Sequence, residues 1–369
     1  MNRGNNTITI VGAGMGGLTL ASVLHRNGIA AVVYDADLSA TSRPQGGMLD
    51  IHQDTGQVAL QAAGLLEAFG KLTLDHGDAT RILDKTGALR MVHEGDGLRP
   101  EIHRGALRNL LLSSLPPGLV RWNARVTGID REQAGFKLSF ADGSVAMAEI
   151  LIGADGAWSK VRPLVSDASP VYFGISFVEL RYLDADRKHP TAAALVGKGF
   201  MMALSDERAI FGHREPNDEL CVYVALKVPV DWSRQPISRD MLQRHFHGWH
   251  ADFHQALANS DGDLLPRSIW MLPEEHRWPR TSGVTLLGDA AHLMSPFAGE
   301  GANLAMIDGA DLARAIIAHP DDIDRAFAAY EAAMFPRAKA AAASSAAGLE
   351  LAFEANAPQA MLDFFEGMK

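Results

Sequence analysis

One stretch near the start of the chain limits its possible folds most strongly. The β-branched run Thr7 to Val11 predicts a short buried strand, and Gly12 to Gly17 follows it with the spacing G-x-G-x-x-G. Apolar residues then recur at helical spacing from Leu18 to Leu24, and a second strand, Ala30 to Tyr34, ends at Asp35. Strand, glycine turn, helix, strand and acid in this order indicate the first βαβ unit of a parallel sheet.

The glycines and the acid of this unit suit a dinucleotide. Gly12 would permit the tight turn, Gly14 would let a pyrophosphate approach the backbone, and Gly17 would let the helix pack against the strand. The helix N-terminus offers free N–H groups and a partial positive charge to phosphates. Asp35 stands where a carboxylate can bind a ribose diol. An ordinary glycine-rich turn is the alternative, and the complete order of elements argues against it.

Length and composition bound the rest of the chain. With 369 residues it exceeds a usual single core, so we expect two closely packed domains. The net charge of −10 argues against nucleic acid or an anionic membrane as the main partner. The single cysteine, Cys221, excludes an intramolecular disulfide and a cysteine-based metal cluster. We see no secretory leader and no apolar run of membrane-spanning length, so we expect a cytoplasmic protein, and we also expect a monomer.

The order of predicted elements indicates an α/β protein. A hairpin is expected over 80–92 and a three-stranded meander over 120–152. Long strands without an intervening helix are expected over 171–230, which indicates a separate, mostly antiparallel sheet. In 220–226 the even-numbered residues should face one way and the odd-numbered residues the other. The remaining predictions are helices over 105–115, 241–258 and 299–319, a strand over 283–287, and alanine-rich helices from 323 onward.

These elements predict two interleaved domains and a C-terminal helix. Residues 1–73, 101–166 and 274–322 should form a Rossmann-like nucleotide-binding domain assembled from separated segments. Residues 74–100 and 167–273 should form an inserted substrate-binding β-sheet domain, and residues 323–369 a helix that bridges the two.

Two later turns repeat the pattern of a buried strand followed by an aspartate. Ile150 to Ile152 leads into Gly153-Ala154-Asp155-Gly156, and Val284 to Leu287 leads into Gly288-Asp289. Ligands of open α/β sheets bind at the carboxyl ends of the strands, so these turns should meet at one site. A helix N-cap is the alternative role for the second turn.

The three turns, in this order, resemble those of the class A flavoprotein monooxygenases of the para-hydroxybenzoate hydroxylase type, over nearly the whole chain. The resemblance implies FAD as cofactor, NADPH or NADH as a transient electron donor, and hydroxylation of an aromatic or polycyclic small molecule by molecular oxygen through a flavin C4a-hydroperoxide. The glycine-rich turn 296–303 could present N–H groups to the anionic reduced flavin. The implied FAD-binding residues are Gly12, Gly14, Gly17, Asp35, Arg43, Asp50, Arg104, Asp155, Asp289, Pro296, Gly299, Gly301, Ala302 and Asn303.

Within this family the chain resembles the tetracycline-inactivating enzymes of the Tet(X) type most, in Gly46 to His52, Glu101 to Arg104 and Gly288 to Asn303. Those enzymes contact the drug through a glutamine, an arginine and a histidine, where this chain has Glu179, Gly199 and Cys221. The resemblance in these three segments makes tetracyclines one substrate class to test. The likeness is weakest in the substrate region, where the three drug-contacting residues differ. The expected substrate-contacting residues are Glu179, Met201, His213, Tyr223, Pro296 and Phe297.

No catalytic residue follows from the sequence. A general base would help if the substrate were a phenol or an enol, because its anion is the better nucleophile. His213, Glu179, Tyr223 and His292 are candidates, and a structural role explains each of them more readily.

A group of histidines between 245 and 254 could suggest a metal. His247, His250 and His254 would share one face of the expected helix. No acid arrangement completes a site and oxygen activation by flavin needs no metal, so none is predicted. Two other functions suit the same scaffold: a flavin-dependent reductase, oxidase or halogenase, and a flavoprotein that sequesters a ligand without catalysis.

Overall fold

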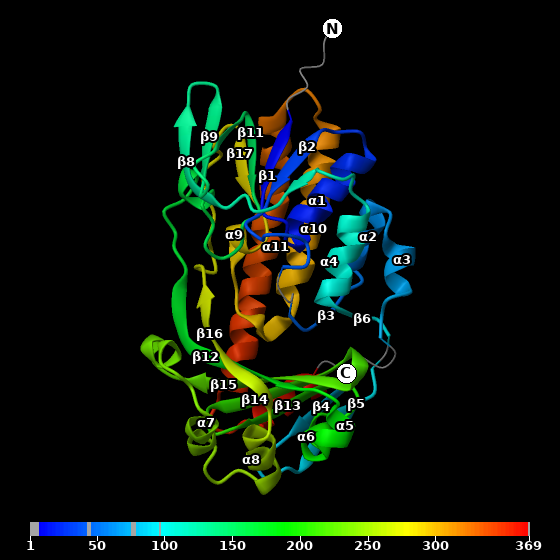
Figure 1. Ribbon diagram of the computed structural model, residues 1–369, viewed down its shortest axis with the longest axis vertical. Coiled ribbons are helices and arrows are strands. Elements are labelled where there is room, and N and C mark those ends of the chain that lie inside the picture. The colour runs from blue at the N-terminus through cyan, green and yellow to red at the C-terminus, as the bar shows by residue number, and fades with distance from the viewer. Residues whose placement is uncertain (1–6, 43–45, 75–78, 96, 368–369) are drawn as a thin grey trace.

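The computed structural model describes residues 7–42, 46–74, 79–95 and 97–367. Strands in this part of the chain form a five-stranded sheet, a seven-stranded sheet and two smaller ones. The five-stranded and seven-stranded sheets occupy the upper and lower parts of Figure 1, and helix α11 (Ile323–Ala352) extends between them. This architecture confirms the predicted α/β fold class.

The five-stranded sheet is parallel throughout and carries the three predicted turns. Its order is β17 (Val284–Leu286), β11 (Ile150–Gly153), β1 (Ile8–Val11), β2 (Ala31–Tyr34) and β7 (Val120–Arg121). Helix α1 (Met15–Arg26) connects β1 to β2 and packs against α10 (Glu300–Ala318). Because β1, β11 and β17 are adjacent and parallel, the turns that follow them lie at the same sheet edge.

The expected meander over 120–152 is partly wrong. Its first strand divides into β7, which pairs with β2, and β8 (Val126–Glu132); its last divides into β10 (Val145–Ala148) and β11. Only β8, β9 (Gly135–Phe140) and β10 form the antiparallel three-stranded sheet. Asn123 takes a left-handed φ of 56°, which ends the first run where it passes from one sheet to the other.

A small two-stranded sheet leads from the parallel sheet toward the larger one. Its strands β3 (Met48–Asp50) and β6 (Glu101–His103) are antiparallel. Helix α4 (Arg104–Ser113) starts directly after β6, and its first N–H, from Arg104, donates to the carbonyl of Gly47 at 3.0 Å. Helices α2 (Gly56–Ala63) and α3 (Leu66–Gly70) follow β3.

The seven-stranded sheet is antiparallel apart from one strand pair. Residues 220, 222, 224 and 226 of β15 pack on one side with the helices behind the sheet, while Tyr223 and Ala225 face the other, which confirms the predicted alternation. The parallel pair is β13 with β4. The sheet order is β16 (Asp261–Met271), β12 (Val171–Tyr182), β15 (Glu219–Lys227), β14 (Arg208–Glu215), β13 (Phe200–Ser205), β4 (Thr80–Leu83) and β5 (Leu89–His93).

Two expectations about helices near this sheet are wrong. Helices α5 (Ala185–Lys188) and α6 (Pro190–Val196) interrupt the strands expected over 171–230, with Pro190 at the first position of α6. The single helix expected over 241–258 is two, α7 (Arg239–His245) and α8 (Ala251–Ala258). Gly248, with a φ of +84°, lies in the break, so the predicted shared face of His247, His250 and His254 does not form.

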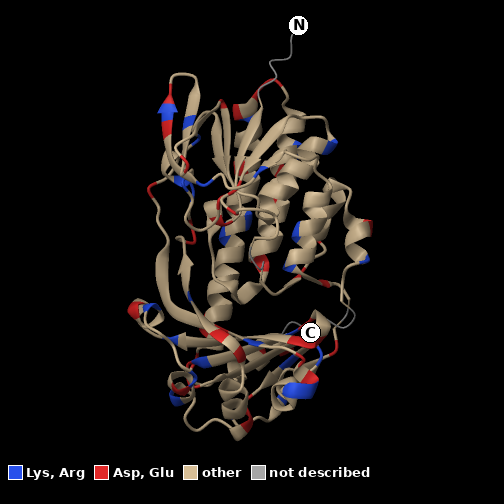
Figure 2. Ribbon diagram, viewed as in Figure 1, with Lys and Arg blue, Asp and Glu red and all other residues tan. Residues whose placement is uncertain are grey.

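Helix α11 joins the two large sheets through its side chains. Phe327, Tyr330 and Met334 belong to the core around the parallel sheet, whereas Leu349 and Ala352 belong to the core on the inner face of the seven-stranded sheet. This confirms the predicted bridging helix, and a shorter helix, α12 (Gln359–Gly367), follows it. Acidic and basic residues are interspersed over both parts of the molecule in Figure 2. Among the described residues, no helix is long and apolar enough to span a membrane.

Candidate active site

The first glycine turn is held tightly at two glycines and leaves the third clear of protein. Gly12 has a φ of +109°, and a Cβ there would lie 2.1 Å from the carbonyl oxygen of Ala154. A Cβ on Gly17 would lie 2.1 Å from the carbonyl oxygen of Gly12. A Cβ on Gly14 would have no heavy atom of another segment within 4 Å, so a phosphate could approach the backbone there.

Asp35 lies at the carboxyl end of β2 and faces this turn. Its Oδ2 accepts from the backbone N–H of Ala13 at 2.6 Å, and its Oδ1 accepts from that of Asp37 at 2.8 Å. Each carboxylate oxygen has a further lone pair for a ribose hydroxyl. Arg43, predicted nearby, lies outside the described residues.

Arg108, which the sequence did not single out, fixes the same turn from α4. Its guanidinium donates to the carbonyl oxygens of Ala13 and Ala40 and to Oδ2 of Asp37, and its side chain is only 3% exposed. A buried arginine with three such acceptors orders the glycine turn and the segment after β2 together. The one feature of the sequence that could have indicated this role is the position of Arg108, a cation on an otherwise apolar face of the helix.

Asp155 and Asp289 end adjacent strands, and a second buried arginine connects their turns. Asp155 accepts from the hydroxyl of Ser159 and the N–H of Lys160, both at 2.6 Å, so its carboxylate stabilises its own turn. From this turn, Arg162 donates to the carbonyl oxygens of Ala290 at 2.8 Å and Asp289 at 3.1 Å. No local pattern in the sequence predicts that Arg162 connects the two turns.

Asp289 is exposed to solvent, although protein atoms crowd it on its other sides. This crowding removes part of its hydration and raises the pKa of its carboxyl, against the opposing charges of His292, Arg104 and Arg162. Within the described residues, no donor is bonded to its carboxylate. An acceptor of this kind fits sugar hydroxyls, as an FAD ribityl chain would supply.

The turn from Pro296 to Asn303 combines a short 3-10 helix (Pro296–Ala298) with the first turn of α10, which includes Ala302. Gly299 takes a left-handed φ of +67°, and a Cβ on it would lie 3.2 Å from Oδ1 of Asp50. A Cβ on Gly301 would have no heavy atom of another segment within 4 Å. The helix start is therefore open to a flat ring, and its N–H groups can favour negative charge.

Asn303 and His52 hold this turn against β3. The Asn303 amide accepts from the backbone N–H of His52 and donates to the carbonyl of Asp50, both at 2.9 Å, so its side chain is committed to the protein. The His52 ring bonds Asp50 Oδ2 at 2.8 Å and lies 3.5 Å from Glu300 Oε1. Burial opposes protonation, but these two carboxylates raise the pKa of His52 to about 9.

His292, a candidate base, lies in a buried ion pair. Its Nε2 is 2.6 Å from Oδ2 of Asp308 on α10, and the same oxygen accepts from the N–H of Gly288. Burial alone would lower the pKa of His292, but the negative charge of Asp308 outweighs it and raises that pKa. A cation paired in this way anchors the Gly288 turn to α10 and is a poor base.

Aromatic side chains of the seven-stranded sheet meet the turn that starts at Pro296. The ring of Phe297 lies edge-on to Phe211 at 5.6 Å and to Phe177 at 5.8 Å, and Tyr223 lies 5.8 Å from Phe177. These rings join the inner face of the sheet to the cofactor turn. Burial raises the pKa of Tyr223, so its phenol stays protonated and can donate.

Two other predicted substrate residues on this face are already engaged. His213 bonds Glu101 Oε1 at 2.9 Å through Nε2 and the carbonyl of Arg214 at 3.0 Å through Nδ1. Glu179 accepts from Arg181 with one oxygen and from Arg267 with the other. Neither side chain is therefore available as a free base.

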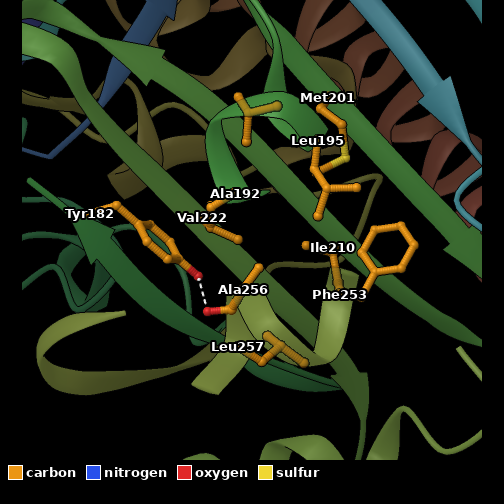
Figure 3. A pocket seen from close by; sticks show the side chains of 10 residues that line it. Tyr182, Ala192, Leu195, Met201, Ile210, Val222, Phe253, Ala256 and Leu257 are labelled. Atoms are coloured by element: carbon orange, nitrogen blue, oxygen red, sulfur yellow. Dashed lines mark hydrogen bonds between the residues drawn. The ribbon is translucent and has the colours of Figure 1, made fainter. Parts of the chain in front are cut away.

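Met201 lies on the opposite face of the sheet, so its expected substrate contact is wrong. It lines a cavity of about 10 Å³ with Tyr182, Val222 and Phe253, and Figure 3 shows these side chains around it. The Tyr182 hydroxyl donates to the carbonyl of Ala256 at 2.9 Å, which leaves an apolar lining. A dry space of this size is a packing defect of the core rather than a ligand site.

Comparison with known proteins agrees with this arrangement. The family model described as FAD binding domain matches residues 5–345. Monooxygenase asqM of Emericella nidulans is 30% identical, covering 90% of this chain and 92% of that protein. The FAD-dependent urate hydroxylase of Mycolicibacterium vanbaalenii is also 30% identical, covering 90% of this chain and 85% of that protein. The tetracycline destructase Tet(51) shares the fold, with a TM-score of 0.75 at 20% identity, covering 99% of this chain and 96% of that chain.

The residues at the shared sheet edge fit an FAD. Gly14 and Gly301 leave the backbone open, Asp35 and Asp289 offer acceptors, and α1 and α10 start beside them. With the family model covering most of the chain, the protein belongs to the FAD-binding-domain family of class A flavin monooxygenases and is an FAD-dependent monooxygenase.

Proposed function

We propose that this enzyme hydroxylates an aromatic or polycyclic small molecule, with NADPH or NADH as the electron donor. The supporting observation is the aromatic cluster of Phe177, Phe211 and Tyr223, which meets Phe297 of the glycine-rich turn. Phe177 and Phe211 are buried in this cluster, whereas Tyr223 and Phe297 stay partly exposed and can contact a flat apolar ring. The named activity of the urate hydroxylase relative, on a heteroaromatic compound, is consistent with this substrate class.

FAD, when bound, supplies the activation of oxygen. The protein then has three tasks. Gly14, Asp35 and Asp289 would hold the dinucleotide, the N-terminus of α10 would favour negative charge beside the ring, and Phe297 with the sheet would orient the substrate and exclude water. These site roles are proposals.

The division into domains is also a proposal. The parallel sheet takes its strands from 1–73, 101–166 and 274–322, and the seven-stranded sheet takes its strands from 74–100 and 167–273, which supports the predicted boundaries. A tetracycline-type substrate, a monomeric state and a cytoplasmic location belong to the same proposal.

The test is a substrate screen with isotopic oxygen. Purified holoenzyme is supplied with NADPH or NADH, with ¹⁸O₂ and with one candidate compound at a time, drawn from tetracyclines, phenols and hydroxylated heterocycles. The masses of the products are measured by mass spectrometry. We expect one labelled oxygen atom in a product and faster NAD(P)H oxidation when that compound is present. Peroxide release without labelled product for every compound would instead favour a reductase or oxidase. A compound that binds but never gains oxygen would favour sequestration.

A further inference from the structure

Glu215, at the end of β14, is a buried carboxylate with one oxygen that is not hydrogen-bonded. Its Oε2 accepts from Nη1 of Arg181, whereas its Oε1 is buried and has no hydrogen-bond partner in the part of the chain that the structure describes; the side chain is 3% exposed. A buried acceptor without a donor costs free energy, so its presence calls for a functional explanation.

The unpaired oxygen faces the cofactor side of the molecule. Residues 211, 213 and 215 of β14 point to the same face of the sheet as the aromatic cluster of Phe177, Phe211 and Tyr223, because side chains alternate along a strand. A Cβ on Gly47 would lie 2.7 Å from Oε1 of Glu215 and 3.9 Å from the hydroxyl of Tyr223. Gly47 precedes β3, and its carbonyl accepts from the first N–H of α4, at Arg104. Glu215 therefore lies where the sheet meets the segment beside the FAD site.

The charges around Glu215 are already balanced. Arg181 donates to both Glu179 and Glu215, and Arg267 donates to Glu179 through two nitrogens. Two arginines thus face two carboxylates. An anionic substrate would have to compete with a carboxylate for either guanidinium, whereas a hydrogen-bond donor would find an acceptor that is free.

We propose that Glu215 selects neutral ring substrates that carry an N–H or O–H donor, by accepting that hydrogen at Oε1. The inference rests on the proposed function and specifies its substrate class. The Tyr223 hydroxyl lies on the same side of Gly47, and it can exchange its weak hydrogen bond to the Cys221 sulfur for one to an acceptor on the same molecule. A lactam or hydroxylated heterocycle presents both groups, whereas a ring carboxylate places a second negative charge beside Glu215.

Ligand binding without turnover tests this. Oxidised holoenzyme is titrated with 2-pyridone, 2-quinolinone and phenanthridinone, and binding is followed by the change in flavin absorbance. Each lactam is compared with its N-methyl derivative and with a carboxylate of the corresponding aromatic ring (pyridine, quinoline or phenanthridine). In the tightest-binding set we expect the N–H lactam to bind about tenfold or more tightly than its N-methyl derivative and than the carboxylate, as a charge-assisted hydrogen bond implies. Equal binding of either counterpart, or no binding by any lactam, would overturn the proposal.

Variants separate Glu215 from general effects. In Glu215→Gln the preference for the N–H lactam should fall about fivefold or more, because a neutral amide is a weaker acceptor. Glu207→Gln, at an exposed carboxylate paired with Lys227 in the same hairpin, should keep the wild-type preference. A preference unchanged in Glu215→Gln would contradict the proposal.

Gly47→Ala provides a second test if Glu215→Gln fails to fold. Its methyl group would press against Oε1 without removing the charge, so it should reduce the same preference, and an unchanged preference would overturn the proposal. Because the titration needs no turnover, a failure of labelled-oxygen incorporation would count against the proposed function and would leave this result interpretable.

Discussion

The pH dependence of folding stability should report the His52 cluster. His52 is buried between Asp50 on β3 and Glu300 at the start of α10, and Arg99 lies 3.8 Å from the same Asp50 carboxylate. The two carboxylates overcome the effect of burial and raise the pKa of His52 from 6.5 to about 9. A raised pKa means that the folded state binds the proton more tightly than the unfolded state.

The sign and size of the effect follow from this difference. The stabilisation is fully present below pH 6.5, the unfolded value, and is lost as the pH rises toward about 9. A difference of about 2.5 pH units corresponds to about 3.4 kcal/mol at most. The Asp50 and Glu300 side chains are 30% and 27% exposed, so solvent weakens the pairing and about 2 kcal/mol is a better expectation.

Urea unfolding at a fixed excess of FAD measures this, followed by circular dichroism from pH 6 to 9.5. Wild-type protein should lose about 2 kcal/mol more unfolding free energy over this range than His52→Gln, which cannot be protonated. His247→Gln, at an exposed histidine after α7, should follow the wild type. If wild type and His52→Gln lost stability in parallel as the pH rose, the assignment of a protonated His52 would be refuted.

Three further predictions concern the turns. Asp289→Ala should weaken FAD binding by about 1–3 kcal/mol, because sugar hydroxyls lose their acceptor, and unchanged FAD occupancy would remove Asp289 from the site. Gly17→Ala should sharply lower the thermal midpoint of unfolding, because its Cβ would lie 2.1 Å from the carbonyl oxygen of Gly12. Gly70→Ala should leave the midpoint unchanged, because no heavy atom of another segment lies within 4 Å of its Cβ. Equal midpoints in the two variants would contradict the close packing at Gly17. Asp308→Asn should cost about 3–5 kcal/mol in urea unfolding, because it strands protonated His292 and Arg337, which both pair with this carboxylate; a loss below 1 kcal/mol would show that these buried charges do not depend on Asp308.

Local patterns in the sequence predicted the elements of the site well. The glycine spacing after β1 and the aspartates after β2, β11 and β17 are each set by a few neighbouring residues, and the alternation along β15 follows from strand geometry.

Long-range pairing could not be read in the same way. Met201 and Met202 are adjacent and equally apolar, and they face opposite sides of the sheet, so only the strand register decides which one meets the substrate face. Arg108 and Arg162 were missed because most of their acceptors are carbonyl oxygens of other turns, and any residue has a carbonyl. The division of 120–152 between two sheets was missed for the same reason, since strand partners are chosen by the whole fold.

Titration of FAD into apoprotein tests the shared FAD site most directly. Gly14 and Gly301 lie on different turns, and a Cβ on either would have no heavy atom of another segment within 4 Å, so a side chain there should enter the proposed cofactor space. We predict one FAD per wild-type chain, and in both Gly14→Val and Gly301→Val a loss of affinity of about a hundredfold or more with an unchanged thermal midpoint of the apoprotein. Wild-type affinity for FAD in either variant would contradict the placement of both turns around a single cofactor.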